Sequence, residues 1–220
     1  DGFWKSHIST SGPAWWIWGM IALGIVLVFN YFGVRLAIRA MLTFAAVSFV
    51  PMVILALVII AKGGKDGNTL TMFDPGQTSL FGITGGGVLG GILLGILLFV
   101  GFEAAASIGE ESEDPRRSIP RALIGTVAVA AGFFVLMAYA FSIGYGKAAV
   151  SEGAWAFSPS AVSEMGTEYI GEWFATILEL VVILDAMALG LAICVVIGRG
   201  FFALGRDGLL PAVFAKTSRY

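Results

Sequence analysis

The stretch of sequence that decides the fold runs from residue 92 to residue 122, ILLGILLFVGFEAAASIGEESEDPRRSIPRA. Its first part is apolar enough for a bilayer core, which a helix crosses in about 20 residues. Gly101 then weakens the helix, and Glu103 places a carboxylate at membrane depth, where a charge is costly unless it faces protein or water. Unwound backbone is tolerated in a bilayer only where it is buried in protein or lines a wet cavity. The stretch therefore predicts a discontinuous helix at a site.

The composition of the whole chain indicates a membrane protein. Hydrophobic residues make up 58% of the chain and charged residues 13%, and the mean hydropathy is +0.90, which is outside the usage of soluble domains. The expected fold class is all-α and transmembrane, in one domain over residues 1–220 without a separate soluble part. Five stretches are long enough to span a bilayer, and the third contains the expected break: 14–32, 37–61, 83–109, 120–146 and 173–203.

The distribution of basic residues predicts an orientation. The connections after the first, third and fifth spans are rich in arginine, and short basic connections stay in the cytoplasm. We therefore expect a multi-pass protein of the cell membrane with an external N-terminus and a cytoplasmic C-terminus. A start at Asp1 and an odd number of spans also indicate a piece of a longer protein. The basic side holds Arg35, Arg39, Arg116, Arg117, Arg121, Arg199, Arg206, Lys216 and Arg219, against Lys5, Lys62, Lys65 and Lys147 opposite.

Several classes of function have no support in the sequence. The single cysteine, Cys194, excludes a disulfide within the chain and favours a packing role. The only histidine, His7, has no second metal ligand nearby, so neither a metal nor another cofactor is expected. The spans contain no histidine that could activate a serine, and no glycine-rich nucleotide loop opens a helix. We expect neither an enzyme nor a nucleic-acid-binding protein.

Two features of the spans have both a structural and a functional interpretation. Gly87, Gly91 and Gly95 form one flat stripe, which suits close packing of another helix or a helix that slides against its neighbours. Asp185 lies near the middle of the fifth span and is a candidate for gating or proton-linked work. The alternative is an Asp185 that is hydrogen-bonded to a neighbouring helix or held neutral by burial. Glu179 is about 120° away around the helix, so the two acids do not form a pair.

The acidic run after the third span is expected to pair with arginines. Acids at the C-terminal end of a helix oppose its macrodipole, so pairing is their most economical explanation. We expect Pro115 to stop the third helix and Ser118 to be the N-cap of the fourth. A mixed-sign cluster at the inner mouth would suit a closing gate, although a solvated charge run is the commoner case. The cluster comprises Glu110, Glu111, Asp114, Arg116, Arg117, Arg199 and Arg206.

Three blocks of sequence resemble amino acid permeases of the amino acid–polyamine–organocation superfamily. The first joins Gly101-Phe102-Glu103, Gly109-Glu110-Glu111 and the run 114–122, and is similar to the signature between helices six and seven of that family. The second, residues 30–35, resembles the turn between helices four and five. The third, residues 199–211, resembles the end of helix eight. Their order and spacing agree over nearly the whole chain.

The resemblance implies that the five spans are helices four to eight of a LeuT-like inverted-repeat fold. In that fold discontinuous helices bind substrate through freed backbone groups near the midplane. It places the break at Leu98, Phe99, Val100, Gly101 and Phe102, with the two phenylalanines over the substrate or closing its path. It also implies a coupling or gating role for Glu103, for which the residues themselves leave open a simple helix cap.

The function implied is secondary active transport of amino acids or related amines by alternating access. The expected partners are the substrate, the bilayer and the remaining helices of the full-length transporter. Coupling to H⁺ or Na⁺ stays open. Some relatives place a lysine in helix five as a stand-in for sodium, whereas the second span has no lysine in its membrane stretch and Ser48 lies near the corresponding position. The alternative is a non-transporting membrane scaffold or sensor that reuses the fold. An unbroken first helix in the full-length protein would favour the scaffold.

Overall fold

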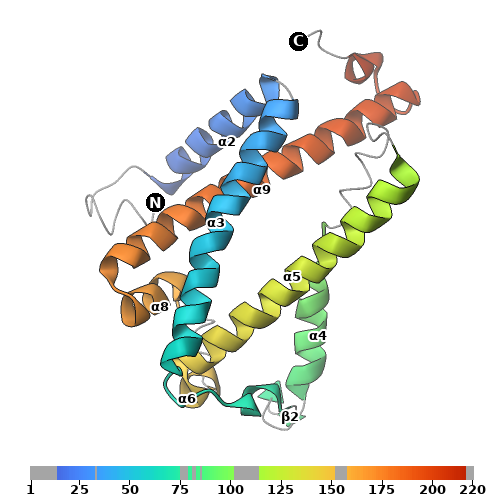
Figure 1. The fold of residues 1–220 in the computed structure, drawn as a ribbon. Helices are drawn as coiled ribbons and strands as arrows, with labels where there is room; N and C mark the ends of the chain where they lie inside the picture. Colours follow the sequence, from blue (N-terminus) through green and yellow to red (C-terminus); the bar gives the residue numbers. More distant parts are fainter. Residues whose placement is uncertain are drawn as a thin grey trace. The chain divides into compact units, whose positions relative to one another are not determined.

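The chain is helical throughout most of the part that the computed structural model describes, which comprises residues 14–32, 34–74, 79–80, 83–84, 86–101, 114–151 and 158–216. A helix lies on each of the five apolar stretches (Figure 1): α2 Trp15–Tyr31, α3 Val34–Lys62, α4 Gly86–Leu98, α5 Pro115–Tyr145 and α9 Glu172–Arg206. Shorter elements lie between them or follow them: η1 Leu70–Phe73, β1 Ser79–Leu80, β2 Ile83–Thr84, α6 Lys147–Ser151, α8 Ala161–Tyr169 and η4 Ala212–Ala215.

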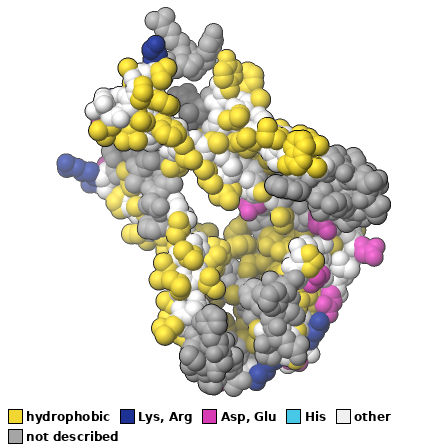
Figure 2. Space-filling model, turned by 180° about the vertical axis from the view of Figure 1, so that it is seen from behind, with side chains coloured by type: hydrophobic (Ala, Val, Ile, Leu, Met, Phe, Trp, Pro, Cys, Tyr) yellow, Lys and Arg dark blue, Asp and Glu magenta, His cyan; other side chains and the backbone are white. Residues whose placement is uncertain are grey.

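The lengths of these helices confirm the all-α transmembrane class. Three are long and apolar enough to cross a membrane, namely Leu36–Lys62, Arg116–Tyr145 and Glu172–Arg206. The apolar helices Trp16–Tyr31 and Gly87–Leu98 are shorter. Figure 2 shows one face of the molecule, where hydrophobic side chains dominate the described surface. Many large hydrophobic side chains are exposed, among them Met20, Leu93 and Leu189, which is expected of helices whose solvent is lipid.

The chain forms two compact units, Asp1–Pro51 with Thr176–Tyr220, and Met52–Ala175. The core of the first unit lies where α2, α3 and α9 meet. Val26, Ala37 and Leu191 are buried at its centre, and a Cβ on Gly190 would lie 3.2 Å from Val26 Cγ2. Glycine at this position therefore lets α2 approach α9. The free cysteine Cys194 packs against the same core, as expected.

The second unit is densest where the C-terminal ends of α3 and α5 meet the short helix α8, a region that we call the knot. Leu55, Ile59, Ile143 and Met165 are fully buried there. A Cβ on Gly144 would lie 3.1 Å from Met165 Sδ and 3.2 Å from Ile59 Cγ2. Close packing of this kind leaves no room for a methyl group without movement of its neighbours. The knot is thus held together by direct contact of three segments.

The start of α5 differs from the prediction. The helix begins at Pro115 with Asp114 in the N-cap position, whereas we expected Ser118 to cap it. Ser118 instead lies inside the first turn and donates its hydroxyl to Asp114 O over 2.6 Å. We expected Pro115 to stop the third helix, but it is the first residue of α5. Proline suits this position because its φ is that of a helix and it has no N–H that would need an acceptor in the first turn. Pro120 is then internal to α5.

The other connections follow the sequence more closely. The α2–α3 turn is as short as predicted, and Asn30 Nδ2 donates to Val26 O over 2.9 Å. Ser160 directly precedes the short helix α8. The stretch between α3 and α4 contains η1 and the antiparallel strands β1 and β2, in which Ser79 pairs with Thr84.

Candidate functional site

The end of α4 lies inside the apolar run. Phe99 N–H donates to Ile96 O over 3.1 Å and Val100 N–H donates to Leu97 O over 3.2 Å, so each bond spans three residues instead of the four of an α-helix. Gly101 follows with φ of +103°, a conformation that glycine adopts without steric cost. Regular helix therefore stops at Leu98, at the first residue of the expected break.

The residues of this turn differ in their surroundings. The side chains of Leu98 and Val100 are 58% and 69% exposed within the described chain. Phe99 is half-buried, and its ring meets that of Phe134 on α5 edge to face, with centroids 5.6 Å apart. The other two residues of the predicted site, Phe102 and Glu103, lie outside the described residues. What the structure adds here is thus an aromatic contact that sequence reasoning missed.

The glycine stripe of α4 is open. A Cβ built on Gly91 or Gly95 meets no described atom within 4 Å. The flat face is therefore not used by the described part of the chain, and the choice between a packing face and a sliding face stays a prediction.

The polar groups inside the first unit centre on Ser48. Ser48 is 5% exposed, and its hydroxyl donates to Phe44 O over 2.8 Å and to Val181 O over 3.3 Å. The hydroxyl thereby joins α3 to α9. Asp185 lies one turn after Val181 and is exposed, whereas Glu179 is half-buried. The structure does not describe a polar neighbour that would assign Asp185 a role, so its gating role stays a prediction.

Two ion pairs near the ends of α5 and α9 join residues that are close in the sequence. Arg117 Nε lies 3.9 Å from Asp114 Oδ2, and Arg206 Nε lies 3.7 Å from Asp207 Oδ1, with all four side chains more than half exposed. Exposed pairs of this kind contribute at most about 1 kcal/mol. Glu110 and Glu111 lie outside the described residues. Arg116 is exposed and Arg199 half-buried, and the predicted pairing between distant turns stays a prediction.

The knot contains polar contacts that the sequence did not reveal. Tyr145 donates its hydroxyl to Glu164 Oε2 over 2.8 Å, and Tyr169 donates to Gly144 O over 2.9 Å. Lys62 Nζ donates to the carbonyl oxygen of Tyr169. These bonds join residues 19 to 107 positions apart, which no local pattern predicts.

Two further contacts join the segments of the knot at its solvent-exposed surface. Lys65 Nζ lies 3.2 Å from Glu168 Oε1, and Lys147 N–H donates to Asp66 Oδ2 over 2.6 Å. Burial raises the pKa of the Tyr169 phenol, and the carboxylate of Glu168 adds to the same shift. Both effects favour the neutral hydroxyl that donates to Gly144 O. One signal in the sequence was the spacing of Glu164 and Glu168, which puts both acids on one face of α8.

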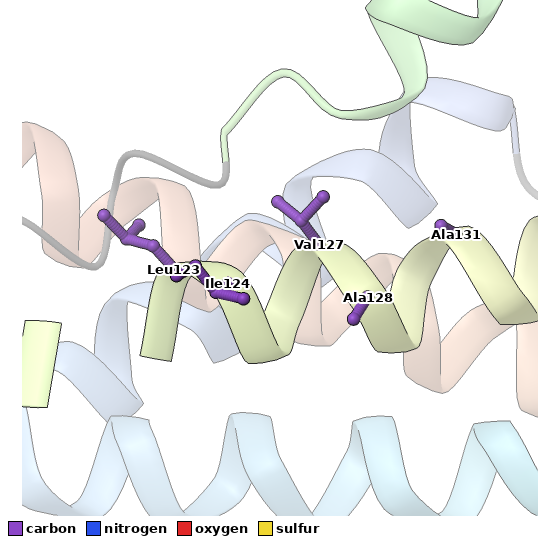
Figure 3. Close-up of a pocket in the computed structure, with 5 residues that line it drawn as sticks. All are labelled: Leu123, Ile124, Val127, Ala128 and Ala131. Atoms are coloured by element: carbon purple, nitrogen blue, oxygen red, sulfur yellow. The ribbon is translucent and has the colours of Figure 1, made fainter. Parts of the chain in front are cut away.

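A shallow groove runs along α5 near its N-terminal end (Figure 3). It has a volume of about 360 Å³ and is lined entirely by this helix. All of its lining side chains are apolar, so the groove offers a charged group no side-chain partner. The lining residues are Leu123, Ile124, Val127, Ala128 and Ala131.

The described residues contain no cluster of side chains suited to bind a metal ion. Among the residues that the structure describes, no group of three or more histidine, cysteine, aspartate and glutamate side chains is placed to hold a metal ion.

Apolar helices of this length, with one that ends inside its own hydrophobic run, define an integral membrane protein. The chain belongs to the amino acid permease family, because the model of that family matches residues 2–220. The resemblance read from the three sequence blocks is thereby confirmed. No solved structure shows significant similarity to the chain.

The curated relatives are named as amino acid transporters. Cationic amino acid transporter 4 of Homo sapiens is 34% identical over 120 residues, 53% of this chain and 18% of that protein. The chloroplastic cationic amino acid transporter 9 of Arabidopsis thaliana is 27% identical over 170 residues, 74% of this chain and 27% of that protein. The branched-chain amino acid permease BcaP of Lactococcus lactis is 27% identical over 133 residues, 60% of this chain and 27% of that protein. The chain thus spans about a fifth to a quarter of their length.

Proposed function

We propose that this chain is the helix-four-to-eight part of a secondary transporter that moves amino acids or related amines across the cell membrane by alternating access. The observation that carries the proposal is the end of α4. In a chain of the amino acid permease family, an apolar helix stops at Leu98 and turns at Gly101 with positive φ. Such helix ends leave backbone groups without intrahelical partners.

Those backbone groups supply the chemistry of binding. The C-terminal end of α4 carries the negative end of a helix dipole, which favours the ammonium group of an amino acid. Phe99 and Phe102 cover the substrate or close its path. The first helix of the full-length transporter contributes a second break, which binds the carboxylate.

The release path follows from the charges. With the arginine-rich connections in the cytoplasm, the chain enters the membrane from outside and ends inside. The charged cluster at residues 110–117, together with Arg199 and Arg206, then separates when the inner side opens. Glu103 couples the cycle to a proton, and Asp185 is the second candidate for such a group. The coupling ion is H⁺ or Na⁺.

Uptake into proteoliposomes containing the full-length protein tests the proposal. Because the relatives are named for cationic and branched-chain amino acids, radiolabelled arginine and leucine are the first substrates, with other amino acids and amines as competitors. We expect saturable uptake that one group of competitors inhibits. Binding of these ligands without any uptake would replace the transporter by the scaffold or sensor.

The role of Glu103 has its own test. Replacing Glu103 by glutamine removes the proton that the carboxyl exchanges but keeps its size and hydrogen-bonding capacity. We expect the variant to lower uptake or to shift its pH optimum, measured between about pH 5 and 8, the range over which a perturbed carboxyl titrates. An unchanged rate at every pH would leave Glu103 as a helix cap.

A further inference from the structure

The turn that ends α4 has one aromatic support from a neighbouring helix in the described structure. Phe99 is half-buried between the exposed Leu98 and Val100, and its ring lies edge to face on Phe134, at 5.6 Å and 80°. Aromatic rings prefer this arrangement, in which the positive edge of one ring meets the negative face of the other. The contact fixes both the position and the tilt of the Phe99 ring.

The rest of α4 contributes little to its own placement. The side chains of Ile92, Leu93, Leu94 and Ile96 are 55–64% exposed within the described chain. The other end of the helix joins the two-residue strands β1 and β2. Within the second unit, α4 is thus attached at its two ends, and the Phe99–Phe134 pair is the attachment at the turn.

Phe134 lies on α5, whose C-terminal end is held in place by hydrogen bonds to α8. It lies 11 residues before Tyr145, about 16 Å along α5 at 1.5 Å per residue. Tyr145 is bonded to Glu164, and the neighbouring Gly144 accepts the hydroxyl of Tyr169. Because α5 continues without interruption from Phe134 into the knot, the position of Phe134 is set by the knot.

We propose that Phe134 is a positioning residue for the substrate site: it holds Phe99, and through Phe99 the turn at residues 99–101, in the orientation that binds substrate. This inference rests on the proposed function for its effect on transport, but its structural part stands without it. Phe134 acts through Phe99 and does not touch the substrate. Its loss therefore weakens binding more than it slows translocation.

The matched variants are Phe134→Leu and Tyr139→Leu. Each replaces one aromatic residue of α5 that contacts a ring outside that helix. Phe134 contacts Phe99 of the turn and also its sequence neighbour Phe133, whereas Tyr139 stacks on Phe73 of η1 at 5.6 Å. Phe134→Tyr keeps the ring and serves as the rescue. Because such a ring pair is worth about a five-fold change in an equilibrium constant, we expect effects of that size.

Hydrogen exchange in nanodiscs tests the structural part. We expect Phe134→Leu to speed exchange of the peptide from Gly95 to Gly101 about five-fold, because the turn opens more often. Phe134→Tyr and Tyr139→Leu should leave this peptide within two-fold of the unaltered protein. Equal exchange in Phe134→Leu and Tyr139→Leu would overturn the inference whether or not the protein transports anything.

Uptake kinetics in the full-length protein test the functional part. We expect Phe134→Leu to raise KM about five-fold with less than a two-fold change in kcat, whereas misfolding of part of the sample would lower kcat at constant KM. In a Phe99→Leu background the same substitution should have no further effect, because the contact is already lost. Additive effects on KM would show that Phe134 does not act through Phe99. Absence of uptake in the unaltered protein would refute the proposed function alone, since hydrogen exchange still decides the positioning role.

Discussion

We expect the substitution Gly64→Ala to destabilise the protein by pushing apart the C-terminal ends of α3 and α5, which meet in the knot. Gly64 follows α3 with φ of +61°, and an ideal Cβ would lie 2.3 Å from Ile143 O and 2.7 Å from its carbonyl carbon. These atoms belong to the backbone of α5, which cannot move aside as a flexible side chain would. The next residue, Lys65, donates its N–H to the same Ile143 O over 3.0 Å. A methyl group at this position therefore competes directly with a hydrogen bond between two segments.

The cost has three parts that can be estimated from this geometry. A left-handed conformation costs a non-glycine residue about 1–2 kcal/mol. Loss of the Lys65 bond costs about 1 kcal/mol, and overpacking of a filled space costs about 1–3 kcal/mol. Together these effects lower the free energy of unfolding by about 3–6 kcal/mol. At about 2–4 °C per kcal/mol for a chain of this length, Tm should fall by about 6–24 °C.

Gly67 provides the matched control for this substitution. Its φ is +82°, but a Cβ there meets no described atom within 4 Å, so Gly67→Ala costs only the backbone strain. We expect its Tm to fall by about 2–8 °C. Tryptophan fluorescence during heating in nanodiscs measures both variants, since the chain contains six tryptophans. Equal Tm values for Gly64→Ala and Gly67→Ala would refute the close approach of Gly64 to α5.

The remaining predictions concern two buried hydroxyls. Tyr169→Phe removes the bond to Gly144 O and should cost about 1 kcal/mol at neutral pH. Because burial raises the pKa of Tyr169, the stability it contributes is complete below about pH 10, the ordinary pKa of tyrosine, and is lost as pH rises through the folded pKa. The Tm difference between the unaltered protein and Tyr169→Phe should therefore shrink above about pH 10; a constant difference up to about pH 11 would contradict the shift. Ser48→Ala removes the link to Val181 O and should lower Tm by about 2–4 °C, whereas Thr43→Ala, whose exposed hydroxyl bonds only within its own helix turn, should change it by less than about 2 °C; equal losses would contradict a role for the link between helices.

The parts of the fold that the sequence predicts are those set by local chemistry. Apolar runs define where helices lie, because only a helix satisfies backbone hydrogen bonds within lipid without a partner strand. Gly101 and Glu103 also predicted a break in the third span, and the family resemblance placed its first residue at Leu98. In the structure α4 ends at Leu98, and Gly101 follows with a φ that side chains avoid. The residues after Gly101 lie outside the described part of the chain, so a break with helix on both sides stays a prediction.

The start of α5 shows where local rules compete with one another. Serine, aspartate and proline all favour helix starts, and the segment from Asp114 to Pro120 contains each of them. We gave most weight to Ser118 as the cap, but the pair Asp114–Pro115 starts the helix one turn earlier. The resulting turn still uses Ser118, whose hydroxyl returns to Asp114 O. Sequence therefore limited the start of α5 to one turn without selecting the residue.

The knot and the Phe99–Phe134 pair could not be predicted, because their partners are distant in the sequence. Tyr145 and Glu164 are 19 positions apart, and Tyr169 and Gly144 are 25 apart. Periodicity describes the faces of a helix but does not say which faces meet. Besides the spacing of the two acids of α8, the glycines were a hint, since Gly64 and Gly144 lie at helix ends, where a close approach of two backbones needs them. From the sequence alone, that hint does not say which helix ends approach each other.

The second unit thus combines a firmly packed region with a sparsely attached helix. Opening of a segment requires little free energy where it has few buried contacts, and more where side chains and hydrogen bonds hold it. By that measure, and among the described residues, α4 with its exposed middle opens more readily than the buried knot around Ile143 and Met165. The transport cycle proposed above would use this difference, because binding could then shift the weakly held element without unfolding the frame. The Phe99–Phe134 contact joins α4 to α5, the helix that continues into the knot, and for this reason its strength, more than that of the knot, should set how firmly the turn is held.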